Sequence, residues 1–126
     1  MANASVSSHP LIQHKLTLLR GVETESSHFR QLIRELTLLL GADALRTLQC
    51  EPKTVQTPLG ECQGHYLNAD IAIIPILRAG LGMTDAMLQL LPQAKVWHLG
   101  LFRDEKELRP VAYYNKLPKG KPVKHA

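Results

Sequence analysis

Apolar residues recur every three or four positions through residues 9–50, which is the spacing of one face of an α-helix. A first short amphipathic helix is predicted to open at His9. A second is predicted to begin at the serine pair 26–27, either of which can cap it, and to run on to about Leu48. The apolar face of the second helix consists of Phe29, Leu32, Ile33, Leu36, Leu39 and Leu40.

The helical period stops after residue 50, and extended patterns follow. Residues 52–67 form two short polar–apolar stretches around a Pro-Leu-Gly turn, which predicts a β-hairpin. Residues 71–77 are almost continuously apolar and β-branched, which is typical of a strand buried on both faces. A helix over 84–91 and a strand over 96–102 complete a βαβ unit within residues 70–102, with a right-handed crossover.

The remaining segments are more polar. Residues 103–118 contain a charged turn and a strand over 111–114 that is expected to return as a hairpin arm. We expect residues 1–8 to be a flexible lead-in and residues 119–126 a tail. With 126 residues, of which 44% are hydrophobic, the chain is long enough for one α/β domain.

Composition excludes some classes and leaves others open. No apolar run reaches the roughly 20 residues that span a bilayer, and the N-terminus does not resemble a signal peptide, so a cytoplasmic location without a membrane anchor is expected. Two cysteines suggest reduced thiols rather than a disulfide framework. Cys62 and His65 have a metal-like spacing but lack two further ligands, which favours ordinary packing or surface residues.

The formal charge of +4 favours phosphate-bearing ligands, although much of the excess lies on tail lysines. A basic tail is more often a solvated end than a binding site. A small nucleic-acid binder is one hypothesis, but the lysines lack interleaved aromatic residues and no known module is present, so nucleic acid is disfavoured as a partner.

A stronger chemical signal follows the first core strand. Arg78 lies at its carboxyl end, where ligands bind in parallel sheets, and Gly80 and Gly82 permit close approach of a ligand to the backbone. The next helix points free N–H groups at the same place, so the loop forms an oxyanion cradle. The alternative is a solvated arginine beside an ordinary turn. Arg103 ends the next strand and is a second candidate for the same anion. The alternative is that Asp104 and Glu105, which follow it, pair with Arg103 or with Arg109.

Five collinear segments resemble the uracil phosphoribosyltransferase family, and together they cover nearly all of residues 9–118. They are HPLIQHKLT at 9–17, TPLG at 57–60, PILRAGLGM at 75–83, LFRDE at 101–105 and PVAYYNKLP at 110–118. The resemblance implies a type I phosphoribosyltransferase fold: a parallel α/β sheet, here incomplete, with N-terminal helices and a β-hairpin arm. It implies an enzyme that joins uracil to 5-phosphoribosyl diphosphate (PRPP), giving UMP and diphosphate with Mg²⁺.

By this resemblance the diphosphate-binding residues are Arg78, Ala79, Gly80 and Arg103. The family also implies a homo-oligomer, with the arm in subunit contacts, and GTP as an effector of some members. Displacement at the anomeric carbon passes through a cation-like sugar, so arginines that stabilise the departing diphosphate suit the reaction and no covalent nucleophile is needed. No catalytic role is therefore assigned to His9, His14 or His98.

Two family features do not occur in this sequence. The PRPP signature, an apolar strand ending in an acidic residue before a Thr-Gly-Gly loop, is absent, as is the segment that contacts uracil. We therefore expect the isolated chain to be inactive, and to be poorly soluble, partly molten or self-associated. The alternative function is a non-catalytic binding or assembly module that keeps the diphosphate loop and the arm.

Overall fold

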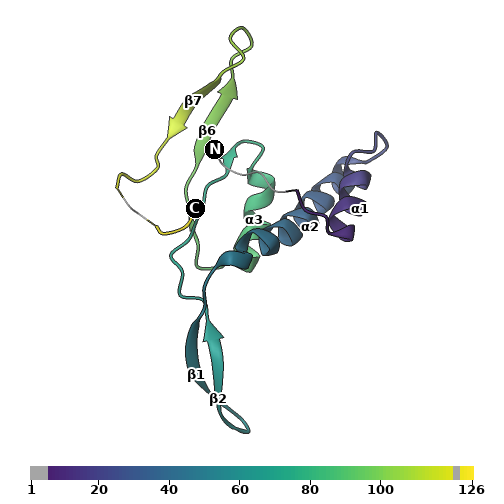
Figure 1. Cartoon of the computed structure of the whole chain (residues 1–126). Coiled ribbons are helices and arrows are strands. Elements are labelled where there is room, and N and C mark those ends of the chain that lie inside the picture. The colour runs from purple at the N-terminus through teal and green to yellow at the C-terminus, as the bar shows by residue number, and fades with distance from the viewer. Residues whose placement is uncertain (1–5, 121–122) are drawn as a thin grey trace.

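A computed structural model describes residues 6–120 and 123–126. Two helices, a hairpin, a βαβ unit and a second hairpin follow one another along the chain (Figure 1). Residues 1–5 of the expected lead-in and 121–122 of the expected tail lie outside the described residues. None of the described helices is both long and apolar enough to span a membrane.

The helical part consists of α1 (Pro10–Leu19), α2 (Ser26–Ala44) and a single 3₁₀ turn, η1 (Leu45–Thr47). The Nδ1 atom of His9 accepts a hydrogen bond from the Leu11 N–H at 3.2 Å, so this histidine caps α1. The serine pair was expected to cap α2, but Ser26 is already its first residue and no side chain caps it. The helix also ends earlier than the predicted Leu48, because the chain tightens into η1 after Ala44.

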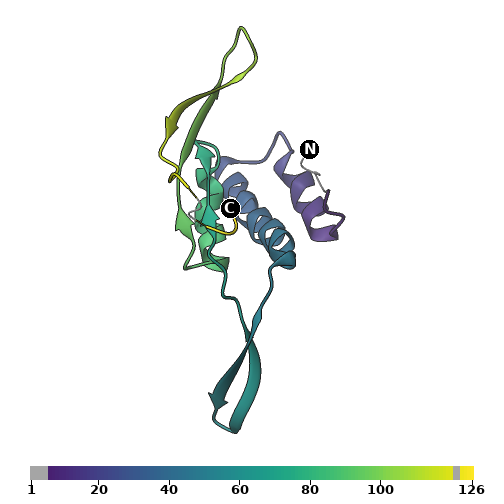
Figure 2. The ribbon, with the colours of Figure 1, turned by 60° about the vertical axis from the view of Figure 1, so that its left-hand side comes forward.

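Helices α1, α2 and α3 (Leu81–Leu90) lie to one side of the strands (Figures 1 and 2). Leu32 and Leu36 of α2 are buried, as the periodicity predicted, and Ile12 of α1 is buried as well. Phe29 and Leu40 stay 44% and 40% exposed. Gly41 allows close packing of α2 on α3, since a Cβ there would lie 2.7 Å from the Met87 Sδ. Helix packing, rather than a backbone requirement, therefore explains this mid-helix glycine.

One ion pair joins α1 to α2. Lys15 donates to the Glu35 Oε2 at 2.6 Å, and Gln31 donates to the other carboxylate oxygen at 2.9 Å. These two hydrogen bonds, chiefly the one from Lys15, lower the pKa of Glu35. Since the folded chain has the lower pKa, the pair contributes stability at neutral pH and loses it as the pH falls through that lowered value.

We expect Glu35→Gln to lower the thermal midpoint slightly at pH 7 and to have no effect in strong acid, where the native carboxyl is already protonated. Thermal scans of both proteins across this pH range measure the difference. Glu23→Gln, at an exposed acid without a partner among the described residues, is the control. An equal effect of Glu35→Gln at both pH values would contradict the assignment.

The first hairpin is confirmed. Its strands β1 (Glu51–Thr57) and β2 (Gly60–Tyr66) pair antiparallel from Glu51↔Tyr66 to Thr57↔Gly60. Gly60 has φ of +133°, a conformation that glycine adopts readily, which fits its place after the Pro-Leu turn. The hairpin projects away from the helices, and most of its side chains are exposed (Figures 1 and 2).

The βαβ unit is also confirmed, although each predicted strand is broken in two. The elements are β3 (Ala72–Ile73), β4 (Ile76–Leu77), α3 (Leu81–Leu90), β5 (Lys95–Val96) and β6 (Leu99–Arg103). Both pairings are parallel, with Ala72↔Lys95 and Ile76↔Leu99. Pro75 interrupts the first strand because it has no N–H to donate, yet its carbonyl still accepts from the Leu99 N–H at 3.3 Å.

Burial of the first strand on both faces was predicted and is only partly found. Ile71 and Ala72 are buried, but Ile76 is 50% exposed. The helices cover one face of the strands, and among the described residues no second layer covers the other. The chain returns to the free edge of β3 at its end, where the Ala72 N–H donates to the His125 carbonyl at 2.9 Å in a parallel bridge.

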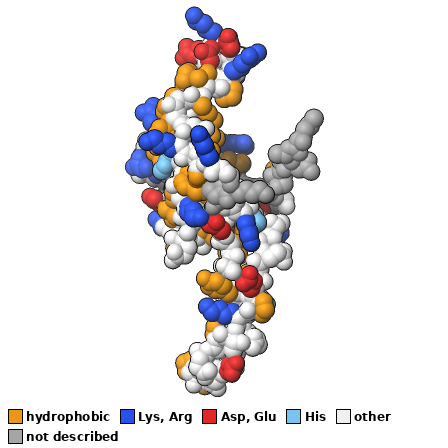
Figure 3. All heavy atoms as spheres, turned by 90° about the vertical axis from the view of Figure 1, so that its left-hand side faces the viewer, with side chains coloured by type: hydrophobic (Ala, Val, Ile, Leu, Met, Phe, Trp, Pro, Cys, Tyr) orange, Lys and Arg blue, Asp and Glu red, His pale blue; other side chains and the backbone are white. Residues whose placement is uncertain are grey.

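The predicted arm is confirmed as β6 and β7 (Pro110–Asn115), which pair antiparallel. Charged side chains gather at its tip, and hydrophobic side chains lie along it toward the body (Figure 3). The Asp104 carboxylate accepts from the N–H groups of Lys106 and Glu107 at 2.9 and 2.8 Å. Asp104 thus shapes the turn instead of forming an ion pair with Arg103.

Candidate functional site

The candidate site is the turn between β4 and α3, formed by Arg78, Ala79 and Gly80. Its backbone is held tightly: the Gly80 N–H donates to the Ile76 carbonyl at 2.8 Å, and the Leu81 N–H donates to the Arg78 carbonyl at 3.1 Å. The peptide bond between Leu77 and Arg78 is cis. The turn places three consecutive predicted site residues at the carboxyl end of a parallel strand and the N-terminus of α3.

The two glycines of this segment have different roles. A Cβ on Gly80 would lie 2.8 Å from the Ile76 nitrogen and 2.9 Å from the Ile76 oxygen, so no larger residue fits. A Cβ on Gly82 would meet only the Ile33 Cγ2 at 3.7 Å, an ordinary contact. Sequence reasoning gave both the same role, approach to a ligand. In the structure Gly80 is needed because the backbone of the turn packs directly against the backbone of Ile76 in β4.

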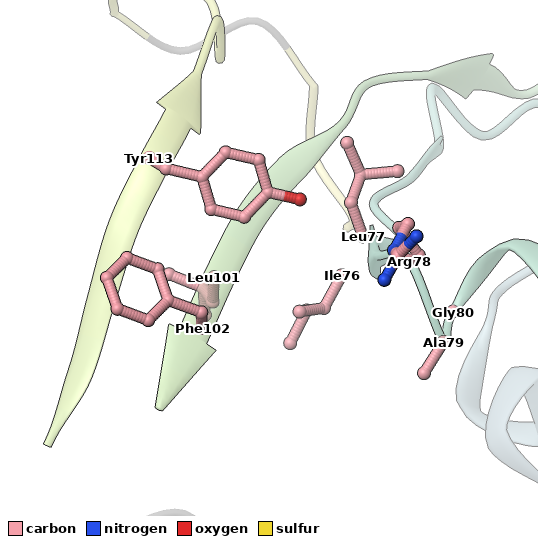
Figure 4. A pocket seen from close by; sticks show the side chains of 8 residues that line it. All are labelled: Ile76, Leu77, Arg78, Ala79, Gly80, Leu101, Phe102 and Tyr113. Atoms are coloured by element: carbon pink, nitrogen blue, oxygen red, sulfur yellow. The ribbon is translucent and has the colours of Figure 1, made fainter. Parts of the chain in front are cut away.

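Arg78, Ala79 and Gly80 line a cavity of about 710 Å³ between β4 and the arm (Figure 4). The other lining residues are Ile76, Leu77, Leu101, Phe102 and Tyr113. Within the described residues, the Arg78 guanidinium has no acidic partner, and the N–H groups of Arg78 and Ala79 have no acceptor. Together with the positive end of α3, these free donors favour an anion.

Arg103 directly follows Leu101 and Phe102, which line this cavity, but Arg103 itself does not line it. It ends β6 and lines an adjoining hollow of about 310 Å³ with Leu108 and Pro110. Leu101 and Phe102 line both spaces. Like Arg78, Arg103 has no ion pair with the described acidic residues. That both arginines bind one diphosphate stays a prediction.

Sequence reasoning missed the aromatic wall of the cavity. Phe102 and Tyr113 line the cavity from the arm, with ring centroids 6.4 Å apart. The available signal was Gly100, since a glycine inside a strand pattern often marks a bulge or a close approach. The family resemblance assigns the arm to subunit contacts and does not point to this wall.

The sequence profile described as uracil phosphoribosyltransferase matches residues 6–126. The chain belongs to the uracil phosphoribosyltransferase family. The resemblance carried by the five segments is therefore confirmed, and the match includes the whole Arg78 turn and the arm.

Relatives named uracil phosphoribosyltransferase are similar over nearly the whole chain. The protein from Roseiflexus sp. (strain RS-1) is 52% identical over 118 residues, which cover 94% of this chain and 57% of the relative. The protein from Thermosipho melanesiensis is 51% identical over 116 residues, covering 91% of this chain and 56% of the relative. The chain thus spans a little over half the length of the curated relatives it matches.

The fold has a solved counterpart in a protein from Aquifex aeolicus. The two superpose with a TM-score of 0.81 at 41% sequence identity, over 89% of this chain and 54% of the other. This likeness confirms the expected α/β architecture, part of a type I phosphoribosyltransferase-like fold with N-terminal helices and a β-hairpin arm.

The donors at the site bear on the Mg²⁺ that the resemblance implies. The cavity is lined by one arginine, one tyrosine and otherwise apolar residues or glycine, with no carboxylate. The described part of the chain contains no group of three or more His, Cys, Asp or Glu residues placed to hold a metal. These side chains do not fit a magnesium site, and no step below is derived through the ion.

Proposed function

We propose that this chain supplies the diphosphate-binding turn of a uracil phosphoribosyltransferase, which joins uracil to PRPP and gives UMP and diphosphate in pyrimidine salvage. The name shared by the relatives supports the reaction. The turn that leaves the Arg78 guanidinium and two backbone N–H groups unpaired beside one cavity is the observation that supports the role of these residues. A cytoplasmic homo-oligomer and a response to GTP belong to the same proposal.

The proposed chemistry of the turn is stabilisation of a leaving group. As the bond from the sugar to diphosphate breaks, positive charge develops on the sugar and negative charge on the departing oxygens. Arg78 and the free N–H groups are already in place before the reaction, so their hydrogen bonds to the leaving group become stronger as that charge develops. Each charge-assisted hydrogen bond contributes about 1.5–3 kcal/mol.

The 126 residues by themselves are proposed to be inactive in UMP synthesis, because they lack the Thr-Gly-Gly signature that binds the sugar phosphate. His125 lies parallel to Ile71 at the free edge of β3. Residues that continued from Ala126 in this direction would run beside β3 and β4 and reach the same sheet edge as Arg78. A chain extended with the corresponding residues of the Roseiflexus relative is therefore expected to form UMP, and the 126-residue chain is not.

Arg78→Ala is expected to weaken binding of inorganic diphosphate by at least tenfold, since it removes a charged donor from the cavity. Isothermal titration calorimetry of the 126-residue chain at constant ionic strength measures this. Arg34→Ala removes the same charge from an exposed position on α2 and should leave binding unchanged. Equal losses in both variants would mean that net charge, rather than the turn, attracts the anion.

A non-catalytic binding or assembly module is the second candidate. The exposed apolar side chains of the arm favour it, with Phe102 50% and Leu108 60% exposed. Both candidates keep the anion-binding turn. UMP formation by the extended chain, dependent on Arg78, supports the enzyme, whereas diphosphate binding without UMP in that chain supports the module.

A further inference from the structure

The pairing of β6 with β7 is interrupted by a β-bulge at Tyr113. Gly100 pairs with Tyr114 and Leu101 pairs with Ala112, so Tyr113 is an extra residue without a partner in the ladder. Bulges of this kind redirect one side chain and are frequent next to binding sites. Tyr113 is also the only described residue of β7 that lines the cavity of the Arg78 turn.

Gly100 allows the redirected ring to lie directly on β6. A Cβ on Gly100 would be 2.6 Å from the Cζ and 2.7 Å from the Cε2 of Tyr113, and 2.8 Å from the Cβ of Tyr114. Any side chain at this position would therefore displace the Tyr113 ring and press on Tyr114 as well. The ring passes from β7 across β6, and its hydroxyl is directed toward the side of the cavity where Leu77 and Arg78 lie (Figure 4). Among the described residues the Tyr113 hydroxyl has no hydrogen-bond partner.

The neighbouring Tyr114 has different surroundings. It does not line the cavity, and the Nζ of Lys116 lies 5.9 Å from the centroid of its ring. The chain thus places two tyrosines side by side, with one redirected to the anion-binding turn and the other left in regular pairing with Gly100. Tyr113 packs on Gly100 but remains 56% exposed, so the bulge does not serve to bury its ring.

We propose that Tyr113 is a diphosphate-binding residue, whose hydroxyl donates a hydrogen bond to the anion held by Arg78, and that Gly100 and the bulge position it. This inference rests on the proposed function of the turn. It assigns a second element, the arm, to the anion site, so that strands β4 and β7 hold the same ligand from opposite walls of the cavity. A phenol donating to a phosphate oxygen is a charge-assisted hydrogen bond.

The test compares Tyr113→Phe with Tyr114→Phe in the 126-residue chain, with inorganic diphosphate as the probe. Tyr113→Phe keeps the ring and its packing on Gly100, and is expected to raise the dissociation constant about five- to tenfold. Tyr114→Phe should bind like the unaltered chain. Diphosphate should also perturb the tyrosine ultraviolet absorbance of the unaltered chain and of Tyr114→Phe, but not of Tyr113→Phe. Thermal midpoints of both variants are expected to match the unaltered chain.

The outcomes separate this inference from the function on which it rests. If Arg78→Ala loses diphosphate while Tyr113→Phe binds it normally, the role of Tyr113 is wrong and the turn keeps its proposed function. Equal weakening by Tyr113→Phe and Tyr114→Phe would also overturn the inference, because the effect would belong to the arm in general. If the unaltered chain does not bind diphosphate, both proposals fail. Gly100→Ala, which displaces the ring, is expected to reproduce the loss seen with Tyr113→Phe.

Discussion

Gly80→Ala is expected to abolish measurable diphosphate binding and to lower the free energy of unfolding by about 1–3 kcal/mol, the usual cost of overpacking. The new methyl group would lie 2.8 and 2.9 Å from the backbone nitrogen and oxygen of Ile76. These atoms cannot move aside freely, since Ile76 is paired with Leu99 in the sheet. The turn must open instead, which breaks the 2.8 Å hydrogen bond from the Gly80 N–H to the Ile76 carbonyl and shifts Arg78.

Gly82→Ala is the matched control for this change. It adds the same methyl group two residues away, inside α3, where only an ordinary contact of 3.7 Å to Ile33 awaits it. Alanine in a helix in place of glycine reduces the freedom of the unfolded chain and adds about 0.4–1 kcal/mol of stability. Urea unfolding followed by circular dichroism, together with diphosphate calorimetry, measures both variants at one protein concentration. Similar behaviour of the two would show that the close approach at Gly80 does not hold the turn.

The elements that the sequence predicted well depend on local patterns. The 3.6-residue period of α1 and α2, the Pro-Leu-Gly turn of the first hairpin and the order strand–helix–strand are each contained in a short stretch of chain. The family segments identified the Arg78 turn for the same reason, since its residues are contiguous. Such features can be predicted without knowing which residues far apart in the sequence contact one another.

The errors concern features that depend on distant partners. Pro75 was included in one continuous strand, although a residue without an N–H interrupts the ladder. The exposure of Ile76 depends on what covers the face of the sheet opposite the helices. The apolar character of Ile76 does not reveal whether anything covers that face. The bulge at Tyr113 depends on the register of β6 against β7. Arg78 lines the larger cavity and Arg103 does not, and this difference depends on the positions of side chains from separate strands. The parallel strand order therefore predicts that Arg78 and Arg103 follow neighbouring strand ends, but it does not predict whether they line the same cavity.

The 126-residue chain is expected to self-associate in solution. It exposes 10373 Å² of surface, whereas a compact monomer of its 14.1 kDa mass exposes about 6,700 Å². Two projecting hairpins and a strand face that helices cover on one side only contribute to this excess (Figures 1 and 2). Of the three outcomes expected from the sequence, association is favoured over a molten state, because the helices and the βαβ unit pack on one another through Leu32, Leu36 and Ala86.

Gel filtration should therefore give an apparent mass well above 14.1 kDa, and the thermal midpoint should rise with protein concentration, as mass action requires of an assembly. Phe102→Lys places a charge among the exposed apolar residues of the arm and is expected to shift elution toward the monomer. Val22→Lys introduces the same charge at an isolated residue that is 97% exposed, and should elute like the unaltered chain. A monomer that melts cooperatively at every concentration would contradict this expectation, since its uncovered strand face would then be stable in water without a partner.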